Sequence, residues 1–240
     1  MDVIQLYSRV MTATLINAAA IIIGTMLGIV GKRYVTPAVK DCLFLGIGVF
    51  TLIIGMDMAL QSQRLLYVAL ALVGGGIVGT LLRIEGVLYS IGERVKNSGI
   101  SRHDHFSEGF LTSSVLFCVG AMAILGSLQA GALGSYEILL TKSVMDGSIA
   151  IILAAAMGGG VALSAVTVLL YQGSLTMLSG MLTPLLNDLM LREISGTGGA
   201  LIIMIGINLT GIKKIQTGNY LPAIVIAILL SAWDPLYALF

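Results

Sequence analysis

The stretch from Leu111 to Leu191 constrains the fold of this chain more than any other part of the sequence. Its only charged residues are Glu137, Lys142, Asp146 and Asp188. A run this apolar cannot cover the surface of a water-soluble domain. It can form helices in lipid, where every backbone amide finds its partner within the chain. The sequence therefore predicts an all-α, polytopic bundle of transmembrane helices.

The composition of the whole chain agrees with this prediction. Of 240 residues, 57% are hydrophobic and 10% are charged, whereas soluble domains carry about 25% charged residues. Glycine occurs 30 times, and glycine lets membrane helices approach each other closely. The net charge of +1 gives no basic surface for nucleic acid. We therefore expect the lipid bilayer as a partner and no nucleic acid.

Apolar runs of about 20 residues mark candidate spans. The sequence predicts eight, at residues 10–30, 42–60, 65–82, 110–130, 143–169, 171–189, 198–212 and 220–233. They form one integral membrane domain, 1–240, in which a cytoplasmic linker, 83–108, separates the first three spans, 10–82, from those in 109–240. No polar loop divides spans five and six, so seven crossings with a re-entrant span six remain an alternative. The predicted break points are Gly158–Gly160 and Pro184.

The distribution of Lys and Arg distinguishes eight membrane crossings from seven. Eight crossings place nine Lys and Arg residues on one side of the membrane and four on the other, while seven crossings give eight and five. Cytoplasmic loops carry the excess of Lys and Arg. The eight-span arrangement fits this rule better and places both termini outside.

Two pairs of segments indicate an internal repeat. The first aligns Gly48–Ala59 with Gly199–Thr210, which matches Gly55 to Gly206 and Asp57 to Asn208. The second aligns Thr14–Gly24 with Leu169–Ser179, which matches Asn17 to Gln172. Each pair is five spans apart, an odd number, so the repeats would be inverted in the membrane. Inverted repeats are typical of secondary transporters, although apolar, glycine-rich strings also align by chance.

Small residues four positions apart predict close helix packing. They occur at Gly24 and Gly28, at Gly75 and Gly79, and at Gly126 and Ala130.

Ionisable residues inside apolar runs need a physical reason, because charge in the bilayer is costly. Asp57 is either a carboxylate that reaches the headgroups or, with Gln61, a site for a cation or proton. Lys142 and Asp146 are one helical turn apart and can pair. They form either an interfacial ion pair near a helix N-terminus, where negative charge is favoured, or a polar site at the mouth of spans four and five.

Neutral polar residues in the spans either hold helices together or line a route for a solute. Asn17 and Gln172, which the second repeat matches, are the first candidates. The full set of candidate path residues is Asn17, Asp57, Gln129, Lys142, Asp146, Gln172 and Asn208.

The sequence gives little support for catalysis. His103 and His105 form an H-x-H pair in the linker, but no further Cys or His completes a metal site, so a solvated loop is the simpler interpretation. No pairing of a nucleophile with a base is apparent. We expect no enzyme activity, no cofactor and no metal.

Several segments in order resemble a bacterial membrane family, domain of unknown function 554 of the YdfK/YqgA type. They are LINAAAIIIGTMLG, FCVGAMAILGSLQAG, LLTKSVMDG, LLYQGSLTML, GGALIIMIGINLTGIKK and NYLPAI. The resemblance implies an integral protein of the bacterial inner (plasma) membrane, with transport as the function usually suggested. The positions that match the recurring pattern are Gly120, Gly126, Gln129, Lys142, Asp146, Gln172, Gly173, Asn219 and Pro222. An acidic residue is common near the Gln129–Gly131 turn in this family, and Ala130 occupies that place here.

The sequence thus favours a membrane transporter or channel that moves a small ion or small polar solute between inverted repeats. Its glycine-rich faces predict a homodimer. The competing interpretation is a membrane scaffold or sensor that transports nothing and whose polar residues only bond helices together.

Overall fold

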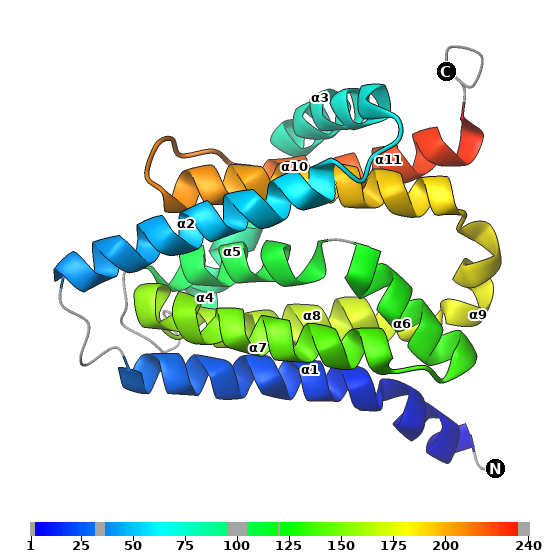
Figure 1. The fold of residues 1–240 in the computed structure, drawn as a ribbon, viewed down its shortest axis with the longest axis horizontal. Helices are drawn as coiled ribbons and strands as arrows, with labels where there is room; N and C mark the ends of the chain where they lie inside the picture. The colour runs from blue at the N-terminus through cyan, green and yellow to red at the C-terminus, as the bar shows by residue number, and fades with distance from the viewer. Residues whose placement is uncertain (1–2, 32–36, 96–104, 120, 235–240) are drawn as a thin grey trace. The chain divides into compact units, whose positions relative to one another are not determined.

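The computed structural model describes residues 3–31, 37–95, 105–119 and 121–234, and the elements found there are helical (Figure 1). They are α1 (Val3–Gly31), α2 (Pro37–Ala59), α3 (Leu65–Leu81), α4 (Ile84–Val95), α5 (Phe106–Cys118), α6 (Ala121–Leu133), α7 (Glu137–Met157), α8 (Gly160–Met177), α9 (Ser179–Leu182), the 3-10 turn η3 (Thr183–Leu185), α10 (Asp188–Leu209), the 3-10 turn η4 (Thr217–Tyr220) and α11 (Pro222–Trp233).

The contacts divide the chain into two compact units. Unit 1 comprises Met1–Ile47 and Tyr89–Leu185, and unit 2 comprises Gly48–Leu88 and Leu186–Phe240. Both units are therefore built from segments that lie far apart in the sequence, and the boundaries fall inside α2 and α4.

Four helices in the described part of the chain are long and apolar enough to cross a membrane. They are Met11–Gly31, Glu137–Met157, Gly160–Met177 and Asp188–Leu209. Two bent pairs raise the number to six if each pair is one span: α3 with α4, bent by 60°, and α5 with α6, bent by 59°. Two shorter apolar helices cover Phe44–Ala59 and Thr217–Trp233. The all-helical, apolar architecture is as predicted, while these criteria give four to six spans.

Several predicted span boundaries are wrong. The run 110–130 is not one helix, because α5 ends at Cys118 and α6 begins at Ala121. The predicted span 143–169 crosses the boundary between α7 and α8, which meet at Gly158–Gly160, one of the two predicted break points. The predicted span 171–189 covers only the end of α8 together with α9, η3 and the first residues of α10. The predicted span 198–212 begins ten residues earlier, at Asp188. The linker 83–108 also contains α4. Each error arises where a charged residue sits inside a helix or an apolar run is interrupted.

The break between α7 and α8 depends on glycine. Gly158 has φ +87°, a backbone conformation that costs little only in glycine. A side chain at Gly160 would meet the backbone of Phe106. The chain can therefore reverse at this point without a polar loop.

In unit 1, α1 lies along α7 and contacts α8, and α5 and α6 pack on α8 (Figure 1). Gly24 and Gly28 make the first contact close, because a Cβ on them would meet the carbonyl oxygens of Gly147 and Ile151. α1 and α8 run antiparallel. Gly159 lies near Ile29 at one end of this contact.

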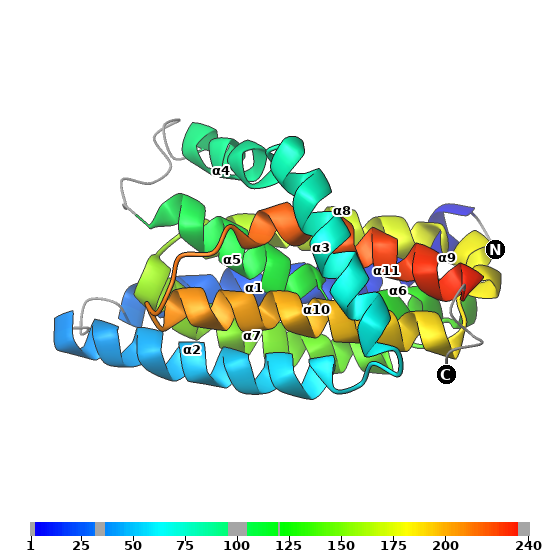
Figure 2. The ribbon, with the colours of Figure 1, turned by 90° about the horizontal axis from the view of Figure 1, so that it is seen from above.

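In unit 2, the second half of α2 packs on α10, and α3 crosses α11 and α10 (Figure 2). Glycines face each other at the first contact. Cβ atoms built on Gly48 and Gly55 would approach the carbonyl oxygens of Gly206 and Gly199. The contact of α3 with α11 and the preceding turn is similar, since Gly75 abuts Ala223 and Gly79 abuts the backbone of Asn219.

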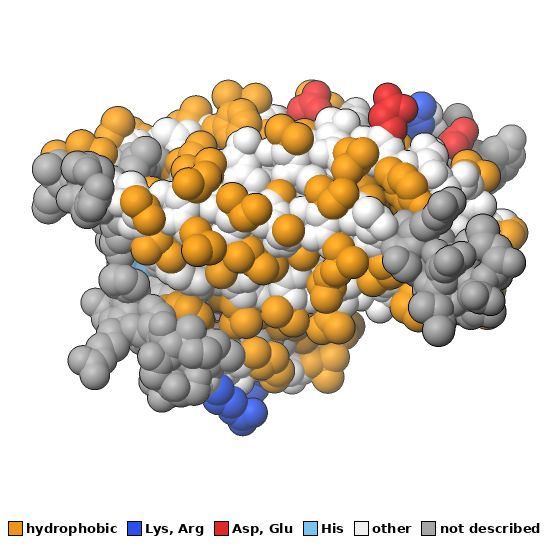
Figure 3. Space-filling model, turned by 90° about the horizontal axis from the view of Figure 1, so that it is seen from below, with side chains coloured by type: hydrophobic (Ala, Val, Ile, Leu, Met, Phe, Trp, Pro, Cys, Tyr) orange, Lys and Arg blue, Asp and Glu red, His pale blue; other side chains and the backbone are white. Residues whose placement is uncertain are grey.

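Large hydrophobic side chains are exposed on both units. On α1, Ile23 is 57% exposed and Met26 62%. Figure 3 shows one face across which hydrophobic side chains are spread, with basic and acidic side chains towards its margins. Such a surface is suited to lipid rather than to water.

Candidate functional site

A buried ion pair lies near the middle of α7. Lys142 Nζ and Asp146 Oδ2 are 2.5 Å apart, and the two side chains are 8% and 6% exposed. One helical turn separates the residues, so they share a face. Because α7 begins at Glu137, Asp146 is not near the helix N-terminus, where the interfacial interpretation would place it.

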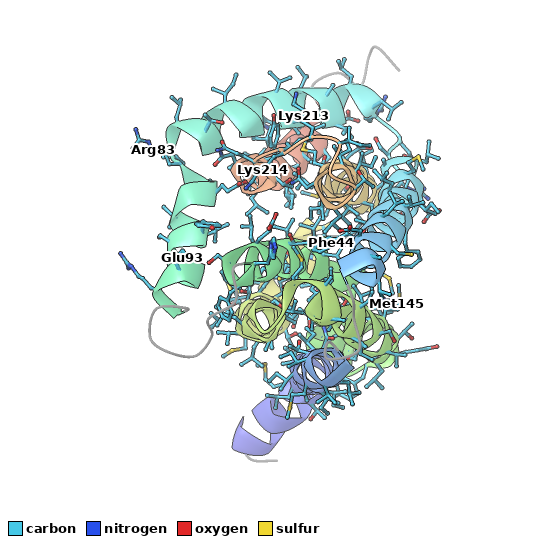
Figure 4. All side chains as sticks on the ribbon, turned by 90° about the vertical axis from the view of Figure 1, so that its left-hand side faces the viewer. Phe44, Arg83, Glu93, Met145, Lys213 and Lys214 are labelled. Atoms are coloured by element: carbon cyan, nitrogen blue, oxygen red, sulfur yellow. The ribbon has the colours of Figure 1, made fainter. Side chains whose placement is uncertain are left out.

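The neighbour of Asp146 in the chain shows how sharply the faces of α7 differ. Met145 is 43% exposed and lies at the margin of the helices in Figure 4. The apolar face of α7 is therefore outward, and the charged face is turned towards α1 and α8.

Asn17 connects the ion pair to two further helices. Its Nδ2 donates to Asp146 Oδ2 at 3.0 Å and to Gln172 Oε1 at 3.2 Å. Asn17 and Gln172 are both fully buried. A carboxylate oxygen only accepts hydrogen bonds when ionised, so Asp146 determines which way the Asn17 amide points. Asn17 in turn determines the orientation of the Gln172 amide.

Four polar atoms beside this network have no hydrogen-bond partner within the described part of the chain. They are Thr14 Oγ1, Asn17 Oδ1, Gln172 Nε2 and Thr176 Oγ1. Thr14 is one turn from Asn17 on α1, and Thr176 is one turn from Gln172 on α8. Because α1 and α8 are antiparallel, both threonines lie on the same side of the Asn17–Gln172 bond. An unsatisfied buried polar group costs about 1–3 kcal/mol, so four together call for an explanation.

The helices α5 and α6 enclose this cluster of Thr14, Asn17, Lys142, Asp146, Gln172 and Thr176, which we call the unit 1 cluster. Lys142 Nζ lies 5.9 Å from the centre of the Phe117 ring, near the end of α5. At the end of α6, Gly131 is so close to Thr176 and Ser179 that a side chain on it would collide with them. The cluster therefore lies beside an interrupted helix, a typical setting for transporter sites.

The structure places the other three candidate path residues differently. Asp57, in unit 2, is exposed and its carboxylate is 3.5 Å from Gln61 Nε2. Asn208, also in unit 2, donates to the carbonyl of Ile215 at 2.8 Å and accepts from its amide at 2.6 Å. Gln129 is half-buried on α6. The cluster thus unites four of the seven candidates: Asn17, Lys142, Asp146 and Gln172.

The structure describes one of the two histidines of the linker. His103 lies outside the described residues. His105 Nδ1 is 3.0 Å from Glu108 Oε2, one turn along α5, and its ring is 6.3 Å from that of Phe44.

Sequence reasoning missed the buried carboxylate of Glu193. This residue is fully buried on α10 and accepts hydrogen bonds from Ser62 Oγ at 2.7 Å and from the amides of Gln63 and Arg64 at 2.9 and 3.0 Å. It thereby satisfies donors at the start of α3. A charged residue ahead of an apolar run is easily assigned to a loop. The local signal that was available is Asn187, whose side chain caps α10 by accepting from the amide of Met190 at 2.8 Å.

Thr14 and Thr176 were also missed as candidate path residues. Their spacing along the sequence could have identified them. Thr14 is three residues from Asn17 and Thr176 is four residues from Gln172, and residues at these spacings share one helix face.

The arrangement presents unused hydrogen-bonding groups that a small molecule can occupy. The charges of Lys142 and Asp146 neutralise each other. The side-chain groups without hydrogen-bond partners are an amide oxygen, an amide nitrogen and two hydroxyl groups. These groups can hold a small polar molecule in a water-poor setting.

Comparisons with known proteins cover nearly the whole chain. A family model described as "Protein of unknown function (DUF554)" matches residues 12–232. "Uncharacterized membrane protein YdfK" of Bacillus subtilis (strain 168) is 30% identical over 220 residues, which are 90% of this chain and 93% of the relative. "Uncharacterized protein YqgA" of Escherichia coli (strain K12) is 28% identical over 229 residues, 93% of this chain and 97% of the relative. No solved structure matches.

Proposed function

This chain belongs to the DUF554 family, and we propose that it is a transporter or channel of the bacterial inner membrane that moves a small polar solute or ion through unit 1. The observation that carries the proposal is the unit 1 cluster. An ion pair and two amides are buried on apolar helices, and four neighbouring polar atoms are left without partners. Polar groups at membrane depth are costly and commonly mark a solute path.

We propose eight membrane crossings for the topology. The six spans obtained by counting each bent pair once, together with the two shorter apolar helices, make eight. The excess of Lys and Arg on one side supports the same number. In this arrangement both termini are outside, so reporter fusions at the two ends would give the same periplasmic signal. Opposite signals would overturn the topology.

An inverted repeat is the second part of the proposal. In unit 2, Gly48 packs at Gly206 and Gly55 at Gly199, although the alignment matches Gly48 to Gly199 and Gly55 to Gly206. A two-fold axis between two segments brings about this crossed pairing. In unit 1, the matched residues Asn17 and Gln172 hydrogen-bond to each other. Both contacts support an inverted repeat in which each segment packs against the segment that it matches in the alignment.

A homodimer completes the proposal, on the ground of the glycine-rich composition, with 30 glycines in the chain. Mass measurement in mild detergent tests it, and a purely monomeric population would remove it.

The competing function is that of a scaffold or sensor that transports nothing. One observation favours it: Asn17 bonds α1 to both α7 and α8, as a polar residue that only joins helices would.

Flux into proteoliposomes distinguishes the two functions. Asp146→Asn and Gln172→Ala are compared with Ser148→Ala, a control on the exposed side of α7 whose hydroxyl bonds only to Val144 O. If the cluster is a path, the first two variants lose most of the flux of sodium, potassium, chloride or small polar solutes, and Ser148→Ala retains it. Undiminished flux in all three variants would exclude the cluster as the path. An unaltered protein that moves none of these solutes would favour the scaffold or sensor function.

A further inference from the structure

We infer that the solute held by the unit 1 cluster is uncharged and both donates and accepts hydrogen bonds, like a small amide or polyol. This inference rests on the proposed function and deepens it. It follows from the cluster's unpartnered atoms, its charge and its dimensions, which are taken in turn.

The unpartnered atoms are chemically mixed. Asn17 Oδ1 can only accept a hydrogen bond, Gln172 Nε2 can only donate, and the hydroxyls of Thr14 and Thr176 can do either. Hard cations such as Ca²⁺ and Mg²⁺ are bound by oxygen ligands, and the donor-only amide nitrogen of Gln172 repels a cation. A molecule that carries an N–H or O–H donor and also an oxygen acceptor can form hydrogen bonds with all four unpartnered atoms.

The orientation of the two amides is not arbitrary. Lys142 and Asn17 both donate to Asp146 Oδ2. Asn17 therefore turns its Nδ2 towards Asp146 and Gln172, and its Oδ1 is left over. Gln172 uses Oε1 to accept from Asn17, so its Nε2 is left over. Asp146 is thus a positioning residue, which sets one free acceptor beside one free donor.

The charge of the cluster disfavours an ion. Lys142 and Asp146 neutralise each other at 2.5 Å and are almost fully buried. The other charged residues in the described parts of the enclosing helices are Arg9 near the start of α1, Glu137 at the start of α7 and Glu108, which faces His105, at the start of α5. α6 and α8 carry none. An entering cation would meet Lys142 and an entering anion would meet Asp146, and an unneutralised charge in this setting is costly.

The dimensions indicate a small molecule. Thr14 and Thr176 are each one helical turn from the Asn17–Gln172 bond, which is about 5 Å along the helix axis. A molecule with a few non-hydrogen atoms, such as urea, acetamide or glycerol, spans this interval.

The test uses the full-length protein in proteoliposomes and isosteric variants. Thr14→Val and Thr176→Val each remove an unpartnered hydroxyl and keep the shape of the side chain. Thr25→Val is the matched control, because Thr25 is a buried threonine of α1 whose hydroxyl already bonds Ile21 O at 2.8 Å. Uptake of urea, acetamide and glycerol is followed by light scattering, and uptake of sodium, potassium and chloride by ion-sensitive dyes.

We expect at least one of the three uncharged probes to enter faster than into protein-free vesicles, and the ions to enter no faster. Thr14→Val and Thr176→Val should each lower uptake about tenfold, a loss that corresponds to one hydrogen bond of about 1.4 kcal/mol, while melting temperature stays unchanged or rises. Thr25→Val should retain the uptake.

Three results would overturn the inference. Ion flux without uptake of any uncharged probe would agree with the proposed transport function but would exclude the inference that the solute is uncharged. Uptake that Thr14→Val and Thr176→Val do not change shows that the solute avoids the cluster. If water permeates and none of the three probes does, the four unpartnered atoms bind water and not a solute. No flux of any kind defeats the proposed function itself.

Discussion

Two carboxylates are buried on apolar helices, Asp146 in unit 1 and Glu193 in unit 2, and their surroundings differ. Glu193 accepts from one hydroxyl and two backbone amides at the start of α3, and one turn away Thr197 Oγ1 is without a partner. Asp146 belongs to a side-chain network on three helices, and four atoms beside that network are unpartnered. Burial of a carboxylate alone therefore does not distinguish a structural role from a functional one. What differs is the number of unpartnered polar atoms nearby in the described structure, four beside Asp146 and one near Glu193, and the function proposed for unit 1 rests on this difference.

The largest effect that tests this comparison should come from Lys142→Met. The change leaves the Asp146 carboxylate buried without its cation, and loss of one partner of a buried pair costs about 3–5 kcal/mol. Unfolding in detergent should show this loss. The double variant Lys142→Met/Asp146→Leu should recover most of it, because it buries no charge. A double variant no more stable than the single one would show that the pair holds unit 1 together by more than charge balance.

Glu193→Ala should have the next largest effect, a loss of about 2–3 kcal/mol. The substitution deprives Ser62 Oγ and the amides of Gln63 and Arg64 of their acceptor, and buried donors without partners are costly. Glu193→Gln retains an acceptor oxygen and should lose less. Solute flux per folded molecule should be unchanged in both, whereas the unit 1 variants lose flux. A selective loss of flux in Glu193→Gln would make the two carboxylates functionally alike.

Close glycine contacts occur in both units and should respond alike. Gly24→Ala places a methyl group against the carbonyl of Gly147, and Gly55→Ala places one against Gly199 and Ile203. Overpacking of this kind costs about 1–3 kcal/mol. Gly46→Ala on α2 is the matched control, since nothing lies within 4 Å of its added Cβ. Helix propensity alone favours alanine, so Gly46→Ala should not destabilise the protein. A loss of stability in Gly46→Ala as large as in the other two variants would show that the close contacts do not explain the cost.

The smallest effect is expected at Asp57. The side chain is exposed, and its contact with Gln61 is 3.5 Å long. Asp57→Asn should therefore change the free energy of unfolding by less than about 0.5 kcal/mol. A substantially larger loss would mean that this carboxylate has a structural partner.

The sequence was sufficient to predict the helical class and to single out Asn17 and Gln172 together. Apolar runs marked the helices because hydropathy is a local property. The weak alignment of Thr14–Gly24 with Leu169–Ser179 also paired Asn17 with Gln172, and these residues are hydrogen-bonded in unit 1.

Other features could not be found because they depend on tertiary contacts. The interruption between Cys118 and Ala121 falls in an apolar run without a change in hydropathy. Asp188 and Glu193 belong to α10 although they precede its apolar part, because Glu193 finds its donors on a distant segment of unit 2. Asn208 could be assigned to a path by its position, yet its amide is engaged by Ile215.

The placement of Lys142 and Asp146 on one turn of α7 also bears on how the protein is made. A helix that carries a lone charge resists partition from the translocon into lipid. Here the cation and the anion meet as soon as their own segment coils, before α1 or α8 has docked. Biogenesis can therefore deliver α7 to the bilayer with its two buried charges already paired and with Glu137 at its first turn, and Asn17 and Gln172 join the pair at a later stage of assembly.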